Sequence, residues 1–112
     1  MKKVVKSCAA ARDIQTAAEY YRDEADLQVA ESFINAVQQA VQQIARWPGS
    51  GSGRFAEVLG LPGLRTVALR RFPYIIFYIE RHDQVDVWRV LHAHRDIPDA
   101  LRDGFDLPSG FK

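Results

Sequence analysis

The chain has 112 residues, of which 47% are hydrophobic, and this length and composition fit a single domain with one core. Its formal net charge of +1 is a weak electrostatic signal for a protein that binds nucleic acid. Its longest strongly apolar run, residues 72–79, is far shorter than the roughly 20 residues that a membrane-spanning helix needs.

The N-terminal quarter predicts a strand followed by a helix. Residues 2–7 contain Val4 and Val5 and read as a short strand, and Ser7 is a suitable N-cap for the alanine-rich segment after it. Between residues 10 and 24 apolar residues recur at helical spacing, while charged residues such as Asp13 occupy the opposite side. No apolar stretch of signal-peptide length follows the basic start, so we expect a cytoplasmic protein.

A second amphipathic helix is predicted after the acidic residues Asp23, Glu24 and Asp26. Asp26 is placed to cap it, and Trp47-Pro48-Gly49 marks its end, because proline cannot continue a helix and glycine tolerates a left-handed exit. The apolar stripe of this helix consists of Ala30, Phe33, Val37, Ala40 and Ile44, flanked by Ile34 and Val41. We expect the two helices to form an antiparallel hairpin.

The second half of the chain predicts strands. Residues 49–53 lack the lysine and hydroxyl residue that complete a P-loop, and we expect a flexible connection there. Residues 54–58 are expected to add a short edge strand, and residues 64–70 a further one. Two β-branched and aromatic runs, 74–79 and 85–91, flank a charged connection and predict a hairpin in which Trp88 is a core residue. Residues 98–112 are expected to be poorly ordered unless bound.

This order of elements and its local sequence resemble the ParE/RelE superfamily of bacterial toxins from type II toxin–antitoxin pairs, over roughly residues 2–97. The motifs that carry the resemblance are, in chain order, Ala10-Ala11-Arg12-Asp13-Ile14, Tyr20-Tyr21, Ala30 with Phe33-Ile34, Pro48 followed by Gly51, Leu64-Arg65, Phe72-Pro73-Tyr74-Ile75-Ile76-Phe77-Tyr78 and Arg89-Val90-Leu91-His92-Ala93-His94-Arg95-Asp96. The resemblance implies an α/β (α+β) domain over residues 1–97, with the order β-α-α-β-β-β(-β) and an antiparallel sheet packed on the helical hairpin. A C-terminal extension, residues 98–112, follows it.

The last motif is closer to the ParE branch, whose members poison DNA gyrase, than to the RelE branch, whose members cut messenger RNA on the ribosome. The resemblance therefore implies a toxin that binds gyrase, alone or in complex with DNA, without catalytic residues, metal or cofactor of its own. It also implies a cognate antitoxin that neutralises the toxin in a hetero-oligomer. We assign target binding to cationic residues of the strand region, namely Arg65, Arg71, Arg89, His94 and Arg95.

Two alternatives remain: a RelE-like ribosome-dependent messenger RNA endoribonuclease, and a detoxified homologue that only binds an antitoxin. RNA cleavage through the 2′-hydroxyl needs a base, an acid and cations that hold the phosphate. Arg65 and Arg95 match RelE-branch positions that hold phosphate, and Tyr78, His92 or His94 would exchange protons. The acidic residues that follow Arg95 would repel a phosphate, which favours protein-directed toxicity.

His92 and His94 also allow a metal site, because residues two apart in a strand point to the same face. Asp96 continues this alternation, but no third strong ligand is evident, so we predict no metal. The alternative is that the histidines donate to backbone carbonyls or pair with Asp96 in a structural turn.

One strand carries apolar residues on both faces. Tyr74, Ile76 and Tyr78 share one face of the predicted strand, and alternate residues share the other. One face must cover the helical hairpin. The tyrosine-bearing face would then be the antitoxin-binding surface, covered by a disordered antitoxin segment that folds on binding. The alternative is that these three residues are core.

Overall fold

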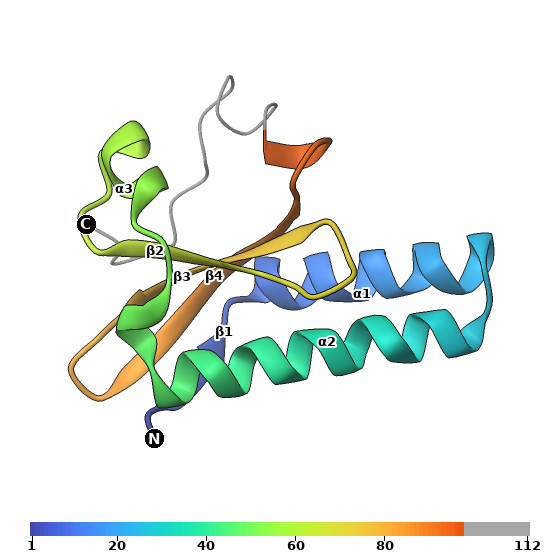
Figure 1. The fold of residues 1–112 in the computed structure, drawn as a ribbon, viewed down its shortest axis with the longest axis horizontal. Coiled ribbons are helices and arrows are strands. Elements are labelled where there is room, and N and C mark those ends of the chain that lie inside the picture. Colours follow the sequence, from blue (N-terminus) through green and yellow to red (C-terminus); the bar gives the residue numbers. More distant parts are fainter. Residues whose placement is uncertain (98–112) are drawn as a thin grey trace.

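The computed structural model describes residues 1–97, in which two long helices and two short ones accompany four strands (Figure 1). The elements are β1 (Lys3–Lys6), α1 (Cys8–Glu24), α2 (Leu27–Arg46), the 3₁₀ helix η1 (Pro48–Ser50), α3 (Arg54–Leu59), β2 (Leu64–Ala68), β3 (Tyr74–Glu80) and β4 (Gln84–His92). This order confirms the expected α+β fold class. The extension at 98–112, predicted to be poorly ordered, lies outside the described residues. No described helix has both the length and the apolar character needed to cross a membrane.

Both long helices begin at the residues that the sequence predicts. The side chain of Ser7 accepts a hydrogen bond from the Ala10 amide at 3.0 Å, and the carboxylate of Asp26 accepts one from the Val29 amide at 2.9 Å. Each cap satisfies one of the amides that a helix start leaves without an intrahelical partner. The second helix ends at Arg46, two residues before Pro48, also as predicted. Local chemistry thus sets the length of the α1–α2 hairpin.

The sheet is mixed, with strand order β1-β4-β3-β2. Strands β2, β3 and β4 form the expected antiparallel meander. Strand β1 lies parallel to β4, with Val4 opposite Val85, so the expectation of a purely antiparallel sheet is wrong at this edge. A parallel pair needs a long crossover between its strands, and the helices with the first two meander strands supply that length.

Residues 54–59 form helix α3, so the short edge strand expected at residues 54–58 is wrong. Gly60, at φ 64°, ends the helix in the left-handed conformation, and its amide bonds to carbonyls of the last turn. The outer edge of β2 is instead met by Ser52, whose backbone exchanges two hydrogen bonds of 2.9 Å with Thr66. A segment this short carries too little periodicity to separate helix from strand.

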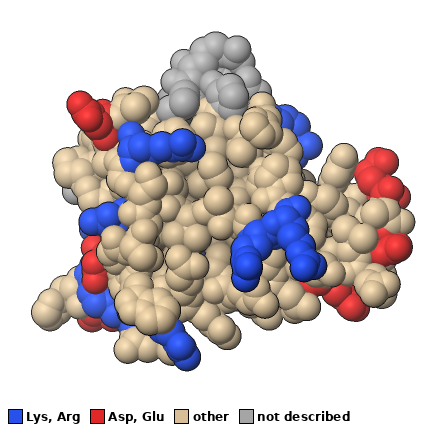
Figure 2. Space-filling model, in the orientation of Figure 1, with Lys and Arg blue, Asp and Glu red and all other residues tan. Residues whose placement is uncertain are grey.

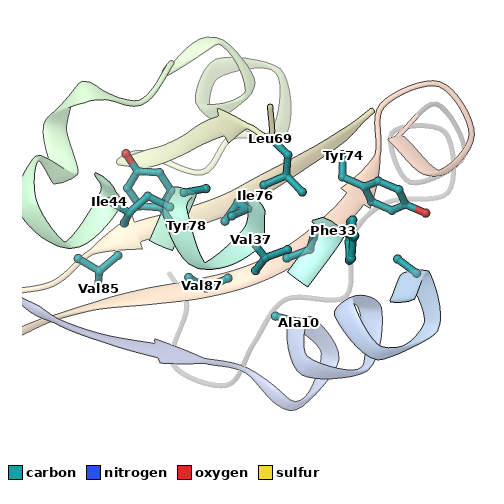
Figure 3. Packing of buried hydrophobic residues seen from close by; sticks show 13 residues of the cluster. Ala10, Phe33, Val37, Ile44, Leu69, Tyr74, Ile76, Tyr78, Val85 and Val87 are labelled. Carbon is teal, nitrogen blue, oxygen red and sulfur yellow. The ribbon is translucent and has the colours of Figure 1, made fainter. Parts of the chain in front are cut away.

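Side chains cover both faces of the sheet. One cluster lies between the sheet and the α1–α2 hairpin and contains Phe33, Val37, Ala40 and Ile44 of the predicted α2 stripe (Figure 3). The other lies under α3 and contains Trp88, which is buried as predicted. Tyr74, Ile76 and Tyr78 belong to the first cluster and are at most 3% exposed. The exposure that we expected for an antitoxin-binding surface is therefore wrong at these three residues, because the hairpin covers the tyrosine-bearing face.

Candidate protein-binding site

The five predicted target-binding residues do not form one surface. Arg65 lies at the start of β2, where its Nη1 donates a 3.0 Å hydrogen bond to the Gly51 carbonyl. Arg89 lies in β4 and faces α1. The other three residues, Arg71, His94 and Arg95, lie at the end of the sheet where β2 and β4 finish and β3 begins.

Arg89 is held inside the protein. Its Nε and Nη2 atoms donate to the carboxylate of Asp13 at 2.7 and 2.9 Å, and the same carboxylate accepts from the Val90 amide at 3.0 Å. The side chains of Arg89 and Asp13 are 27% and 15% exposed. This pairing disfavours the assignment of Arg89 to target binding, since the guanidinium would first have to leave a part-buried ion pair.

The residues that RNA cleavage would need are also separated. Arg65 is paired with Tyr78 in the sheet register, and Arg95 contacts Tyr74, four residues earlier in β3. At the rise of a β-strand this separation is about 13 Å along the sheet. The two arginines therefore do not surround one phosphate.

Two of the candidate proton-exchanging groups have structural partners. The Tyr78 hydroxyl is buried, donates to the Pro48 carbonyl at 2.5 Å and accepts from the Gly51 amide at 3.1 Å. Burial raises the pKa of Tyr78, which opposes its use as a base. Nδ1 of His92 accepts from the amides of His94 and Arg95 at 3.2 and 3.0 Å, and burial lowers the pKa of His92.

The histidine pair forms a turn. Strand β4 ends at His92, so the alternation on which the metal alternative depended stops before His94. The carboxylate of Asp96 accepts from the His92 amide at 3.0 Å, so Asp96 closes a turn here through the backbone of His92 and not through its imidazole. Among residues 1–97, no three His, Cys, Asp or Glu side chains are placed to hold a metal ion.

Arg95 sits on an aromatic surface at this end of the sheet. Its Nη2 donates to the Tyr74 hydroxyl at 3.1 Å, its Nε donates to Asp96 at 3.3 Å, and its guanidinium lies 5.8 Å from the centre of the Tyr20 ring. The side chain is still 54% exposed. His94 and Arg71 are exposed as well, so three cationic or titratable side chains are accessible at this end.

Two grooves lie on either side of α2. The first, of about 710 Å³, runs between α1 and α2 on their outer side. Its apolar floor consists of Ala11, Ile14, Ala18, Leu27, Ala30 and Ile34. Charged side chains, Glu19, Arg22 and Glu31, lie at its margin. Leu27, which lines this groove, is 61% exposed.

The second groove, of about 860 Å³, lies between α2 and the β2–β3 connection. Ser32, Asn35 and Gln39 line it from α2, and Arg70, Arg71 and Phe72 line it from the connection. Figure 2 shows basic side chains on this face at the place of the β2–β3 connection, and acidic side chains gathered at the α1–α2 turn.

Several residues of these surfaces are absent from the sequence-based prediction. Arg70 precedes the predicted Arg71 directly, so its position in the sequence could have predicted that it lies on the same surface. Leu27 follows the predicted cap Asp26 and lies outside the buried stripe, which is also readable from the helical period. Asp13 carried no such signal, because its partner Arg89 is 76 residues away in the chain.

Comparison with known proteins identifies the family to which this chain is similar. The chain matches the family model described as the ParE toxin of type II toxin-antitoxin system, parDE, over residues 4–97. A solved structure of the chromosomal ParDE TA system from P. aeruginosa is similar in fold, with a TM-score of 0.71 and 20% sequence identity. The similarity covers 84% of this chain and 98% of that chain. No curated protein sequence matches the chain.

Proposed function

The chain belongs to the ParE family of toxins from type II toxin–antitoxin systems, and we propose that it inhibits DNA gyrase by binding and is neutralised by a cognate antitoxin. The dispersal of the residues that RNA cleavage would need supports this proposal most. Arg65 and Arg95 are far apart along β3, while Tyr78 and His92 are engaged with backbone groups. A protein that binds its target needs no such constellation.

For the target-binding surface we propose the end of the sheet that carries Arg71, His94 and Arg95. Arg95 and His94 lie in the turn after β4, and the aromatic residues beneath them give that turn a firm base. A net charge of +1 favours a specific contact with a protein over general attraction to DNA. Because gyrase acts on the bacterial chromosome, this proposal places the protein in the cytoplasm.

For the antitoxin we propose the groove between α1 and α2. Its apolar floor and charged margin match the two sides of an amphipathic helix, which binds such grooves through residues at helical spacing. The exposed Leu27 would be covered in such a complex. This groove replaces the buried residues Tyr74, Ile76 and Tyr78 as the antitoxin-binding surface.

Expression in bacteria tests the function. The chain is expressed alone and together with the product of the neighbouring small gene, and SOS induction, DNA breakage and messenger RNA length are followed. We expect growth inhibition with DNA breaks, intact messenger RNA and rescue by the neighbouring gene product. Trimmed messenger RNA with intact DNA would favour the nuclease, and a harmless protein would favour the detoxified homologue.

A gyrase assay tests the surface. Purified protein is added to gyrase and supercoiled DNA, and cleaved DNA is measured. The His94→Ala/Arg95→Ala variant should lose activity. The matched control is Arg12→Ala/Arg46→Ala, which removes exposed arginines from α1 and α2 that are not part of the proposed surface. Equal activity of both variants would contradict the proposed surface.

A further inference from the structure

The groove between α2 and the β2–β3 connection is lined by two arginines that have no ionic partner among residues 1–97. Arg70 and Arg71 are both exposed, and neither makes an ion pair or a hydrogen bond to another described residue. By contrast, the arginines at positions 22, 81, 89 and 95 each lie within 3.3 Å of a carboxylate. A guanidinium presents a rigid fork of donors that fits carboxylate or phosphate oxygens. The groove is therefore suited to an anion.

The backbone at Arg71 is strained. Its φ is 72°, and it is the one residue other than glycine with positive φ among residues 1–97. Such residues persist only where the surrounding structure holds them, and they cluster at functional sites. The strained residue Arg71 and its neighbour Arg70 both line one groove. The observed backbone thus points to the same surface as the unpaired charges.

The character of the anion follows from the rest of the groove. Asn35 and Gln39 each carry a donor and an acceptor, which is what an extended peptide backbone requires. Outside the groove, the acidic residues Asp23, Glu24 and Asp26 precede α2, and Glu31 lines the neighbouring α1–α2 groove. They would repel a long polyanion such as DNA. A short peptide with a few carboxylates avoids this repulsion and still reaches both arginines.

Asn35 connects this groove to the proposed antitoxin site. It lines both the α1–α2 groove and the Arg70–Arg71 groove, so the two surfaces meet on the outer side of α2. A chain that leaves the first groove at Asn35 enters the second. We propose that the antitoxin places an acidic peptide segment, next to its groove-binding helix, on Arg70 and Arg71. This inference rests on the proposed toxin–antitoxin function.

The consequence is a route to neutralisation. Arg71 belongs to the end of the sheet proposed to bind the target, so an acidic antitoxin segment on it would occupy part of the same surface. The antitoxin would then compete with the target directly for a cation.

A direct binding measurement tests the groove. A fluorescein-labelled hexaglutamate peptide is titrated with the purified full-length chain, and fluorescence anisotropy is recorded at low and at physiological ionic strength. We expect binding that weakens with salt, and a loss of about tenfold in Arg70→Gln/Arg71→Gln. The control Arg12→Gln/Arg46→Gln loses the same charge elsewhere and should bind like the wild type. Equal affinity of the two variants, or tighter binding of a DNA oligonucleotide of equal charge that depends on Arg70 and Arg71, would overturn the proposal.

A second measurement identifies the occupant. The purified complex with the neighbouring gene product should no longer bind hexaglutamate, since its own acidic segment fills the groove. Unchanged peptide binding to that complex would refute the antitoxin as occupant. Growth assays keep the two proposals apart. If the chain is toxic and neutralisable but does not bind the peptide, only the proposed acidic-peptide site in the groove is contradicted. If the chain is harmless, the proposed toxin function is contradicted, whether or not the peptide binds.

Discussion

The carboxylate of Asp13 on α1 accepts three hydrogen bonds from β4, two from the Arg89 guanidinium and one from the Val90 amide. This single side chain connects the helical hairpin to a central strand of the sheet. The ion pair is largely covered, with 27% of Arg89 and 15% of Asp13 exposed. Removing the acid takes its hydrogen bonds away from a guanidinium and an amide, which costs more than the bonds themselves contribute.

We expect Asp13→Ala to lower the free energy of unfolding by about 2–3 kcal/mol, measured by urea denaturation. The exposed control, Asp23→Ala, removes a carboxylate that pairs with Arg22 on the surface and should change stability by less than about 0.5 kcal/mol. In the double variant Asp13→Ala/Arg89→Met, part of the loss should be recovered because the guanidinium that had bonded to Asp13 is also gone. Additive losses would contradict the coupling.

Gly51 lies against the Tyr78 hydroxyl. An added Cβ at Gly51 would overlap that oxygen and lie 3.0 Å from the Thr66 carbonyl. We expect Gly51→Ala to reduce stability by about 1–3 kcal/mol, because the loop would have to move away from the sheet. Gly49→Ala is the matched control, with nothing within 4 Å of its Cβ. Similar thermal unfolding of both variants would show that the contact at Gly51 is unimportant.

The lowered pKa of His92 should make the stability of the protein depend on pH. Burial lowers its pKa below the ordinary value of 6.5, with the cation of Arg95 acting in the same direction. The unfolded chain therefore binds this proton more readily than the folded chain does. The stability that neutral His92 contributes is complete above about pH 6.5, and it is lost as the pH falls through the folded-state pKa.

The measurement is the unfolding free energy between pH 8 and pH 5. The acid-side loss should be smaller in His92→Asn, which cannot take up a proton, than in the wild type. The control His82→Asn, in the exposed β3–β4 turn, should follow the wild type. Parallel profiles for wild type and His92→Asn would exclude His92 as the origin.

Arg71 should be replaceable by glycine without loss of stability. Glycine removes the strain of the positive φ, which stabilises the folded chain by about 1–2 kcal/mol. The greater freedom of glycine in the unfolded chain offsets about 0.5–1 kcal/mol of this gain. Arg71→Gly should thus be neutral or stabilising by up to about 1 kcal/mol. Arg71→Val should be destabilised, because a β-branched residue tolerates positive φ poorly. Thermal melts of the pair decide this, and the opposite order would contradict the backbone geometry.

Leu27 tests the antitoxin groove. Leu27→Asp should leave folding intact, because the residue is exposed and an acidic side chain is favourable in the first turn of a helix. Binding of the antitoxin should weaken by about tenfold, as expected for losing an apolar contact. Val58→Asp on α3, where Val58 is 68% exposed, is the control. Calorimetric titration with the neighbouring gene product gives both affinities, and no difference between them would place the antitoxin elsewhere.

The helical hairpin and the meander were determined by the sequence itself. Ser7 and Asp26 cap amides three residues ahead, and Pro48 acts on its own backbone, so each signal and its effect lie within one helical turn. The buried stripe of α2 follows from the same local period. These local patterns, in their order, also carried the family resemblance.

Only the tertiary structure decided which faces of the helices and strands pack together and which side chains they cover. Strand β3 is apolar on both faces, so its pattern could not show that α1 and α2 cover Tyr74, Ile76 and Tyr78. The parallel pairing of β1 with β4 and the capture of Arg89 by Asp13 join residues about 80 positions apart, and no local period reports on such a contact. Whether an arginine in this chain is free or held depends on partners that only the folded packing brings together.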